Sequence, residues 1–203
     1  MKLGFITSIL DGWTYEQMMD FASGQGFECV EVACWPEEKA ERRYAGVSHI
    51  DAERVNQDDE YAAHIMAYAE KAGVEISALA YYPNVMTADK EKRNAAIEHL
   101  KNVIRASKKL GVGMVTTFIG RDQTKNVREN LELVKEIWPP IIKLAEVCDV
   151  KIAIENCPML FGEEQWPGGQ NLMTTPSIWR EVFKILDSDN LALTTIHPTL
   201  SGR

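Results

Sequence analysis

Short apolar runs alternate with longer amphipathic segments along this chain, and this alternation constrains the fold more than any other feature. We predict buried strands over residues 3–7, 29–33, 76–81, 113–119 and 151–156, and a sixth strand over 191–195. Strands that are apolar on both faces and alternate with helices are typical of a parallel sheet covered by helices. Two architectures satisfy this pattern, namely an open doubly wound sheet and a (β/α)8 barrel.

The predicted helices cover residues 15–26, 58–73, 90–110 and 127–147, and a fifth helix begins near 176. Thr14 is the expected N-cap of the first helix, and either Thr175 or Ser177 is expected to cap the last. Glycines that directly follow the second and third helices are expected to end them. The pair Pro139-Pro140 is expected to bend or break the fourth helix, because proline rings remove backbone donors and clash with the preceding turn.

The net charge, the first ten residues and the cysteines bear on which partners and which cell compartment are expected. A net charge of −8 gives an acidic surface that repels phosphate backbones, so no nucleic-acid partner is expected. Residues 1–10 contain a short apolar run without a cleavage pattern, so neither a secretory leader nor a membrane span is predicted. The four cysteines lack the spacing of a zinc site, which favours reduced thiols and a cytoplasmic protein.

The stretch IAIENCP places Glu155 at the end of an otherwise apolar strand. In both candidate architectures, chemistry sits at the carboxyl ends of the strands. A carboxylate in this position is costly to desolvate, so it needs a metal ion or a cationic partner. Hard oxygen ligands suit Mg²⁺ or Mn²⁺, which makes Glu155 our candidate metal ligand. The alternative is a salt bridge to a neighbouring strand.

Aromatic and amide side chains near the other strand ends are candidates for binding a small-molecule carbohydrate. These candidates are Trp35, Tyr81, Asn84, Asn156 and Trp166. Packing alone is the alternative role for each aromatic side chain. The histidines at positions 49, 64 and 99 have no ligand spacing, and we interpret them as structural or solvent-facing.

The segment IENCPMLFGEEQWPGGQNL resembles the xylose isomerase-like TIM barrels, which include sugar phosphate isomerases and epimerases. The stretches ALAYYPNVMTADKEKR, VGMVTTFIGRD and IWPPIIKLAE are similar to the same family, and the resemblance covers residues 1–190. It implies a single domain over 1–203 of the (β/α)8 TIM-barrel type, incomplete here, with five strand–helix units and a sixth strand.

The resemblance also implies a site and an activity. In this family a divalent metal (Mn, Mg or Co) is held by a Glu ending strand five, an Asp ending strand six, a His ending strand seven and a Glu ending strand eight. Glu155 matches the first of these ligands, so the resemblance implies that it is both a metal ligand and a catalytic residue. In the epimerases, the two glutamates move a proton on and off a carbon beside a carbonyl, while the metal polarises the substrate oxygens. The implied function is a metal-dependent sugar or sugar phosphate isomerase or epimerase.

The last residues depart from the family. After Asn190 the family usually continues with a strand whose D-P-S-H motif supplies the second metal ligand, whereas this chain reads LALTTIHPTLSGR. With suitably chosen codons, deleting one base from the family strand yields this sequence in the shifted frame. We therefore predict a frameshift near Ala192 and a shifted tail over 191–203, in which His197 is not the family histidine. A divergent sixth strand is the alternative.

The departure of the tail has consequences for function. We expect the chain to lack three of the four family ligands, to bind a divalent metal weakly or not at all, and to have no isomerase turnover. The alternative function is a non-catalytic half-barrel that assembles through exposed sheet edges, for example as a homo-oligomer. A DNA repair enzyme of the endonuclease IV type is disfavoured, because it needs a cluster of zinc-binding histidines and a basic groove.

Overall fold

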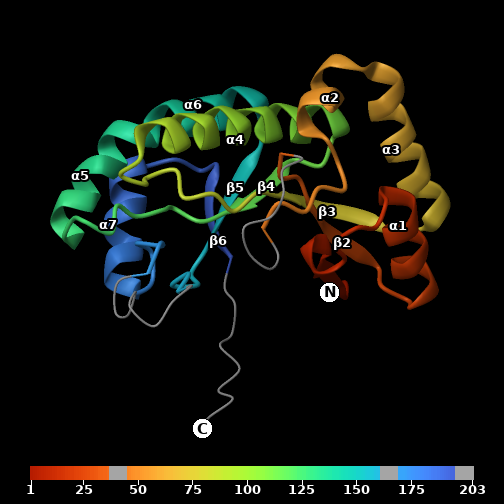
Figure 1. The fold of residues 1–203 in the computed structure, drawn as a ribbon, viewed down its shortest axis with the longest axis horizontal. Coiled ribbons are helices and arrows are strands. Elements are labelled where there is room, and N and C mark those ends of the chain that lie inside the picture. The colour runs from red at the N-terminus through yellow and green to blue at the C-terminus, as the bar shows by residue number, and fades with distance from the viewer. Residues whose placement is uncertain (37–44, 161–168, 195–203) are drawn as a thin grey trace, which may run out of the picture.

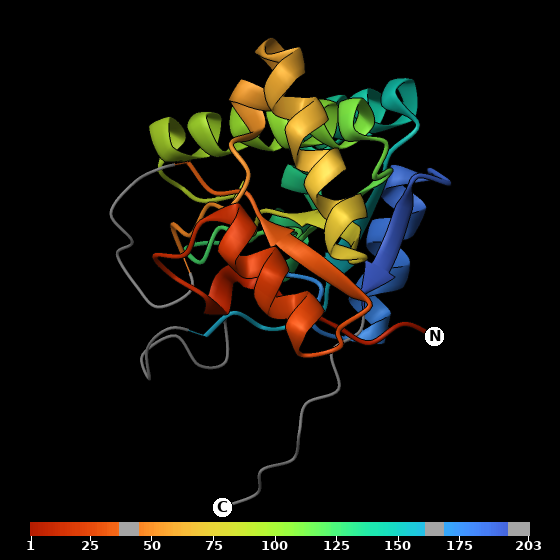
Figure 2. The ribbon, with the colours of Figure 1, turned by 90° about the vertical axis from the view of Figure 1, so that its right-hand side faces the viewer.

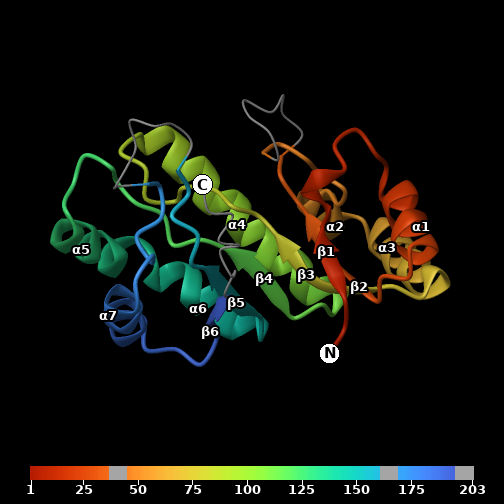
Figure 3. The same ribbon diagram turned by 90° about the horizontal axis from the view of Figure 1, so that it is seen from below.

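The computed structural model describes residues 1–36, 45–160 and 169–194. At its centre is one sheet of six parallel strands that follow one another in sequence order (Figure 3). A doubly wound sheet would place later strands on both sides of the first strand, so the observed order confirms the barrel-type architecture. The strands are β1 (Gly4–Ile6), β2 (Cys29–Ala33), β3 (Glu75–Ala80), β4 (Met114–Thr117), β5 (Lys151–Glu155) and β6 (Leu191–Thr194).

Helices follow the strands and pack on the sheet. In Figure 1, α4 and α6 lie side by side above the strands, and in Figure 2, α1 packs beside α3. The structure confirms the five predicted helical regions and adds the short helix α2 between two of the predicted elements. The helices are η1 (Thr7–Ile9), α1 (Tyr15–Gly24), α2 (Ala52–Gln57), α3 (Asp59–Ala72), α4 (Lys90–Leu110), α5 (Val127–Ile137), α6 (Pro139–Cys148) and α7 (Pro176–Leu186).

Short-range signals define most of the helix ends. The Thr14 hydroxyl accepts the backbone N–H of Gln17, and the Gln17 side chain accepts that of Thr14, which forms a capping box at the start of α1. Gly73 and Gly111 adopt the left-handed conformation that ends α3 and α4. Thr175 occupies the N-cap position of α7, but its side chain makes no capping hydrogen bond. The predicted cap of α1 is therefore confirmed in full, and that of α7 in position only.

The proline pair divides the predicted fourth helix in two. α5 ends at Ile137, and α6 begins at Pro139, where the missing N–H would have no helical partner in any case. Trp138 lies between the two helices and is completely buried. Its indole Nε1–H donates to the carbonyl of Ile119 at 3.0 Å. Trp138 therefore connects the junction of α5 and α6 to the segment that follows β4.

The capping box of α1 leads to a prediction. We expect Thr14→Ala to lower the free energy of unfolding by about 1 kcal/mol, because it removes the oxygen that accepts the Gln17 amide. Thr175→Ala is the matched control, since Thr175 holds the same position without a capping bond, and we expect a loss below about 0.5 kcal/mol. Urea denaturation of the two variants measures both losses. Equal losses would contradict the role of the capping box.

The two faces of the sheet carry different side chains. Ile152 and Ile154 of β5 are completely buried in the hydrophobic core, whereas Glu155 points to the other face. In β2, the same alternation places Glu31 between two completely buried valines. The outer face therefore packs against the helices, and the inner face carries the polar groups.

The sixth strand, β6, lies at the edge of the sheet. It consists of the first four residues of the tail that we interpret as frameshifted. Residues 191–194 pair in register with 152–155 of β5. The rest of that segment, including His197, lies outside the described residues. Within the described residues, β1 and β6 each pair with one strand only. Among these described residues, no helix is both long enough and apolar enough to cross a membrane.

Candidate functional site

A cavity of about 670 Å³ opens on the inner face of the sheet. Its walls come from β1 and η1, from β2 and the residues after β3, and from the ends of β5 and β6. Glu31, Glu155, Trp35 and Tyr82 all line it. The carboxyl ends of the strands are where (β/α) barrels hold their active sites. We therefore treat this inner cavity as the candidate site.

Glu155 is the last residue of β5, and the alternation of the strand turns its side chain into the inner cavity. Burial raises the pKa of Glu155 to about 7, and the negative charge of Glu31 adds to this increase. A carboxyl group that titrates near neutral pH is suited to taking up and releasing a proton. The structure thus places the predicted residue at the wall of the cavity.

Glu31 is a second carboxylate of the inner cavity. Its Oε1 accepts the phenol O–H of Tyr82 at 2.6 Å and the hydroxyl O–H of Thr116 at 2.7 Å. Burial and the charges of Glu31 and Glu155 raise the pKa of Tyr82 well above its usual value, so the phenol keeps the proton that it donates. The sequence places Glu31 and Tyr82 near strand ends, but our candidate site residues did not include them or Thr116. The signal for Glu31 was a charged residue inside the apolar strand CVEVA.

The two tyrosines after β3 have different surroundings. Tyr82 lines the inner cavity and stacks with Trp35, with ring centroids 6.0 Å apart and planes inclined by 30°. Tyr81 is buried against His99 of α4, with ring centroids 4.5 Å apart. Trp35 contacts both tyrosines, since its ring also meets that of Tyr81 edge-on with centroids 5.8 Å apart. The structure therefore brings the predicted Trp35 to the cavity with Tyr82 stacked on it, while the predicted Tyr81 packs behind it against α4 and does not line the cavity.

Asn84 joins the loops that follow β3 and β4. Its Nδ2 donates to the Arg121 carbonyl at 2.8 Å, and its Oδ1 accepts the Arg121 N–H at 2.9 Å. Gly120 has a φ of +85°, and a Cβ there would come within 2.7 Å of the same Oδ1. These contacts place Asn84 outside the wall of the inner cavity, where it fixes the relative position of two loops at the carboxyl end of the sheet.

The chain after β5 is held by Asn171, a residue that our sequence analysis missed. Its Nδ2 donates to the backbone carbonyls of Glu155 and Cys157, each at 2.7 Å. Asn156 lies between these two residues, and the wall of the inner cavity does not include it. Trp166 lies outside the described residues. No motif distinguishes Asn171, because its role depends on a fold-back of the chain.

The three predicted structural histidines lie away from the inner cavity. His49 is buried and hydrogen-bonds the hydroxyl of Thr7, and the ring of His99 lies 2.7 Å from the carbonyl oxygen of Cys34. His64 contacts Glu16 at the surface where α3 meets α1. The four cysteines are all free thiols.

The residues of the inner cavity can be tested against the metal site that the resemblance implies. Of the four implied ligands, the described residues place Glu155 at the cavity. Residues 1–36, 45–160 and 169–194 contain no group of three or more His, Cys, Asp or Glu side chains that could hold a metal ion. Small hard cations keep their water molecules unless several protein ligands replace them. The described residues therefore do not form a complete metal site.

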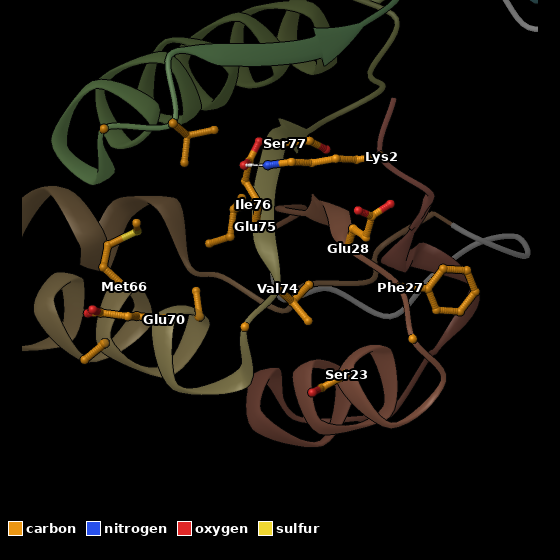
Figure 4. A pocket seen from close by; sticks show the side chains of 16 residues that line it. Lys2, Ser23, Phe27, Glu28, Met66, Glu70, Val74, Glu75, Ile76 and Ser77 are labelled. Atoms are coloured by element: carbon orange, nitrogen blue, oxygen red, sulfur yellow. Dashed lines mark hydrogen bonds and ion pairs between the residues drawn. The ribbon is translucent and has the colours of Figure 1, made fainter.

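A second cavity, of about 900 Å³, lies near the amino-terminal ends of the strands and is lined by residues of α1 and α3 (Figure 4). Lys2 forms an ion pair with Glu75 in this cavity. Glu28 accepts the backbone N–H of Leu3 at 3.0 Å. These charged groups are already partnered, and (β/α) barrels carry their chemistry at the opposite end of the strands. We therefore assign the candidate site to the inner cavity.

Sequential parallel strands, outer helices and a strand-end carboxylate in an inner cavity define an α/β protein of the (β/α)-barrel class. The family model of the xylose isomerase-like TIM barrel matches residues 19–195, and the chain belongs to this family. The family match confirms the resemblance seen in the sequence. No curated protein matches the chain in sequence.

Solved structures share the fold at low sequence identity. The D-psicose 3-epimerase of Clostridium cellulolyticum H10, determined with D-tagatose, is 18% identical with a TM-score of 0.68, over 96% of this chain and 63% of that one. The probable 3-DHS dehydratase AsbF of Bacillus anthracis is 16% identical with a TM-score of 0.67, over 96% and 62%. The IolI protein with a bound zinc atom is 18% identical with a TM-score of 0.63, over 95% and 62%. The chain thus spans less than two thirds of the length of these three proteins.

Proposed function

We propose that the inner cavity is a carbohydrate site of the sugar isomerase and epimerase type, in which Glu155 is placed to accept a proton from a carbon next to a carbonyl. One observation carries this proposal: Glu155 ends β5 and faces a cavity that it shares with a second carboxylate and a stacked aromatic pair. Membership of the xylose isomerase-like family and the shared fold with a D-psicose 3-epimerase support this class of reaction.

In the proposed step, the Glu155 carboxylate accepts the proton of the carbon beside the substrate carbonyl. The electron pair of the broken C–H bond forms the C=C bond of an enediolate, and the carbonyl oxygen takes up the negative charge. An acid on the opposite face of the sugar must return a proton to the same carbon to give an epimer. Glu155 itself can return the proton to the former carbonyl carbon, which gives an isomer once the proton of the neighbouring hydroxyl moves to the former carbonyl oxygen. Trp35 and Tyr82 offer an apolar wall for the C–H face of the sugar.

The incomplete set of metal ligands limits the activity that we propose for this chain. In the family, a divalent metal such as Mn²⁺, Mg²⁺ or Co²⁺ supplies polarisation of the carbonyl when it is bound. Among the described residues, Glu155 alone matches a family ligand, and Glu31 is the second carboxylate of the inner cavity. The described residues contain no group of three side chains that could hold a metal ion. We propose that the 203-residue chain binds such an ion weakly and has no isomerase turnover.

The test combines binding and turnover. D-fructose, D-tagatose and myo-inositol are offered to the wild-type chain in saturation-transfer NMR, product formation is followed with added Mn²⁺, and Mn²⁺ binding is followed by calorimetry. We expect at least one of these sugars to bind, with no product and no saturable binding of Mn²⁺. Product that disappears in Glu155→Gln would overturn the proposed inactivity and establish the role of Glu155. A failure of all three sugars to bind would overturn the carbohydrate site.

A non-catalytic half-barrel that assembles through its sheet edges is the second candidate. Within the described residues, β1 and β6 each have one paired edge, and Leu3 and Ile9 beside β1 are 65% and 53% exposed. Unpaired strand edges favour association with another chain. A dimer in analytical ultracentrifugation that dissociates in the variant Leu3→Lys, together with a lack of sugar binding by the wild-type chain, would favour this candidate.

A further inference from the structure

We propose that the inner cavity takes a neutral polyhydroxylated ligand rather than a sugar phosphate, and that Glu31 binds hydroxyl groups of this ligand through Oε2. This inference rests on the proposed carbohydrate function and names the substrate class of the same cavity. It assigns to Glu31 a role that the resemblance to the family does not supply.

The first argument is the way in which Glu31 is held. An ionised carboxylate has about four acceptor positions on its two oxygens. Both hydrogen bonds that described residues donate to Glu31 reach the same oxygen, Oε1. Thr116 is buried within β4, and Tyr82 is stacked on Trp35, so both donors are themselves fixed. The carboxylate is therefore oriented before any ligand arrives, and Oε2 keeps its capacity to accept hydrogen bonds.

The second argument is the balance of charge. Glu31 and Glu155 both line the inner cavity, and the described part of its wall contains no lysine or arginine. A phosphate group carries negative charge, and proteins bind it with arginine, lysine or exposed backbone N–H groups. Beside these two carboxyl groups, a phosphate would meet repulsion. Uncharged hydroxyl groups instead donate hydrogen bonds to carboxylate oxygens.

The third argument is the aromatic pair beside Glu31. Trp35 and Tyr82 stack with ring centroids 6.0 Å apart, and the hydroxyl of Tyr82 is tied to Glu31. A sugar or cyclic polyol has hydroxyl groups around its rim and C–H groups on its faces. An apolar ring surface joined to a carboxylate matches both features at once.

The test uses the intact chain and two comparisons. In the first, D-fructose and D-fructose 6-phosphate compete in NMR titrations of the wild-type chain, and we expect the neutral sugar to bind about tenfold more tightly or better. In the second, the dissociation constant of the neutral sugar is measured in Glu31→Gln, which keeps an oxygen for Tyr82 and Thr116. We expect this constant to rise about tenfold, because a bond to a charged acceptor is replaced by a weaker one.

Controls separate this inference from the proposed function. Glu132→Gln removes an exposed glutamate on α5, which pairs with Lys135, and should leave sugar binding unchanged. If Glu31→Gln does not fold, Tyr82→Phe removes one donor to Glu31 while keeping the ring, and should weaken binding severalfold. Equal binding of the sugar by wild type and Glu31→Gln, or tighter binding of the phosphate, would overturn the inference and leave the carbohydrate site intact. A lack of binding by every sugar would overturn both.

Discussion

Glu155→Gln is expected to raise the free energy of unfolding by about 2 kcal/mol near pH 8 and to change it little near pH 4. Burial raises the pKa of Glu155 to about 7 in the folded protein, from an ordinary value of 4.5 for a glutamate in water. Because the folded-state pKa is the higher one, the wild-type protein loses stability as the pH rises from about 4.5 through about 7. The full shift corresponds to about 3.4 kcal/mol, which partial solvent exposure reduces to about 2 kcal/mol. Glutamine has the same shape and stays neutral throughout.

Urea denaturation of wild type and Glu155→Gln near both pH values measures this effect. Glu132→Gln is the matched control, because it makes the same change at an exposed position on α5 and should alter stability by less than about 0.5 kcal/mol. A variant that is less stable than wild type near pH 8 would show that Glu155 has a stabilising partner. The expected gain in stability at a functional position is the usual trade-off between stability and activity.

Trp138→Ala is expected to lower the free energy of unfolding by about 3–5 kcal/mol. Trp138 is completely buried at the junction of α5 and α6. The substitution leaves a cavity and also removes the N–H that the Ile119 carbonyl accepts. Since domains of this size are stable by about 5–15 kcal/mol, the loss would be a large fraction of the total.

Two further variants show which part of the Trp138 side chain matters. Trp138→Phe keeps most of the volume and removes the hydrogen bond to Ile119, so we expect a loss of about 1–2 kcal/mol. Trp13→Ala removes a tryptophan that is 40% exposed and contacts Phe21 edge-on, and we expect a loss below about 1.5 kcal/mol. Thermal and urea unfolding rank the three variants. A loss in Trp138→Ala no larger than that in Trp13→Ala would contradict the role of the junction.

Much of the fold was predictable because its signals act over a few residues. The boundaries of β2 and α4 are those predicted from apolar runs and from the glycine after α4. The break before Pro139 follows from the chemistry of the proline ring. α2 was missed because it is six residues long, and its buried face exists only through packing on α4, where Asn56 donates to the Asn102 carbonyl at 3.0 Å.

The candidate site was predictable in part. Glu155 stood out because a carboxylate that ends an apolar strand is costly to bury without a function. The sequence alone does not show which of the adjacent residues Tyr81 and Tyr82 faces the inner cavity. Adjacent residues at a strand end point in different directions, and the register shift between Val30 and Glu31 affects which residues of β3 lie beside β2.

Local chemistry in the sequence was enough for the alternation of strands and helices, for most helix ends and for the position of Glu155 at the end of β5. Local patterns left the order of the strands open between two architectures; the family resemblance favoured the barrel order, and the structure confirms it. The hydrogen bonds of the second carboxylate emerged only from the folded chain. Tyr82 and Thr116 lie 51 and 85 residues from Glu31 along the chain, yet both donate to one of its oxygens. Contacts across such separations depend on how strands pair in the sheet, and no local pattern of residues specifies that pairing.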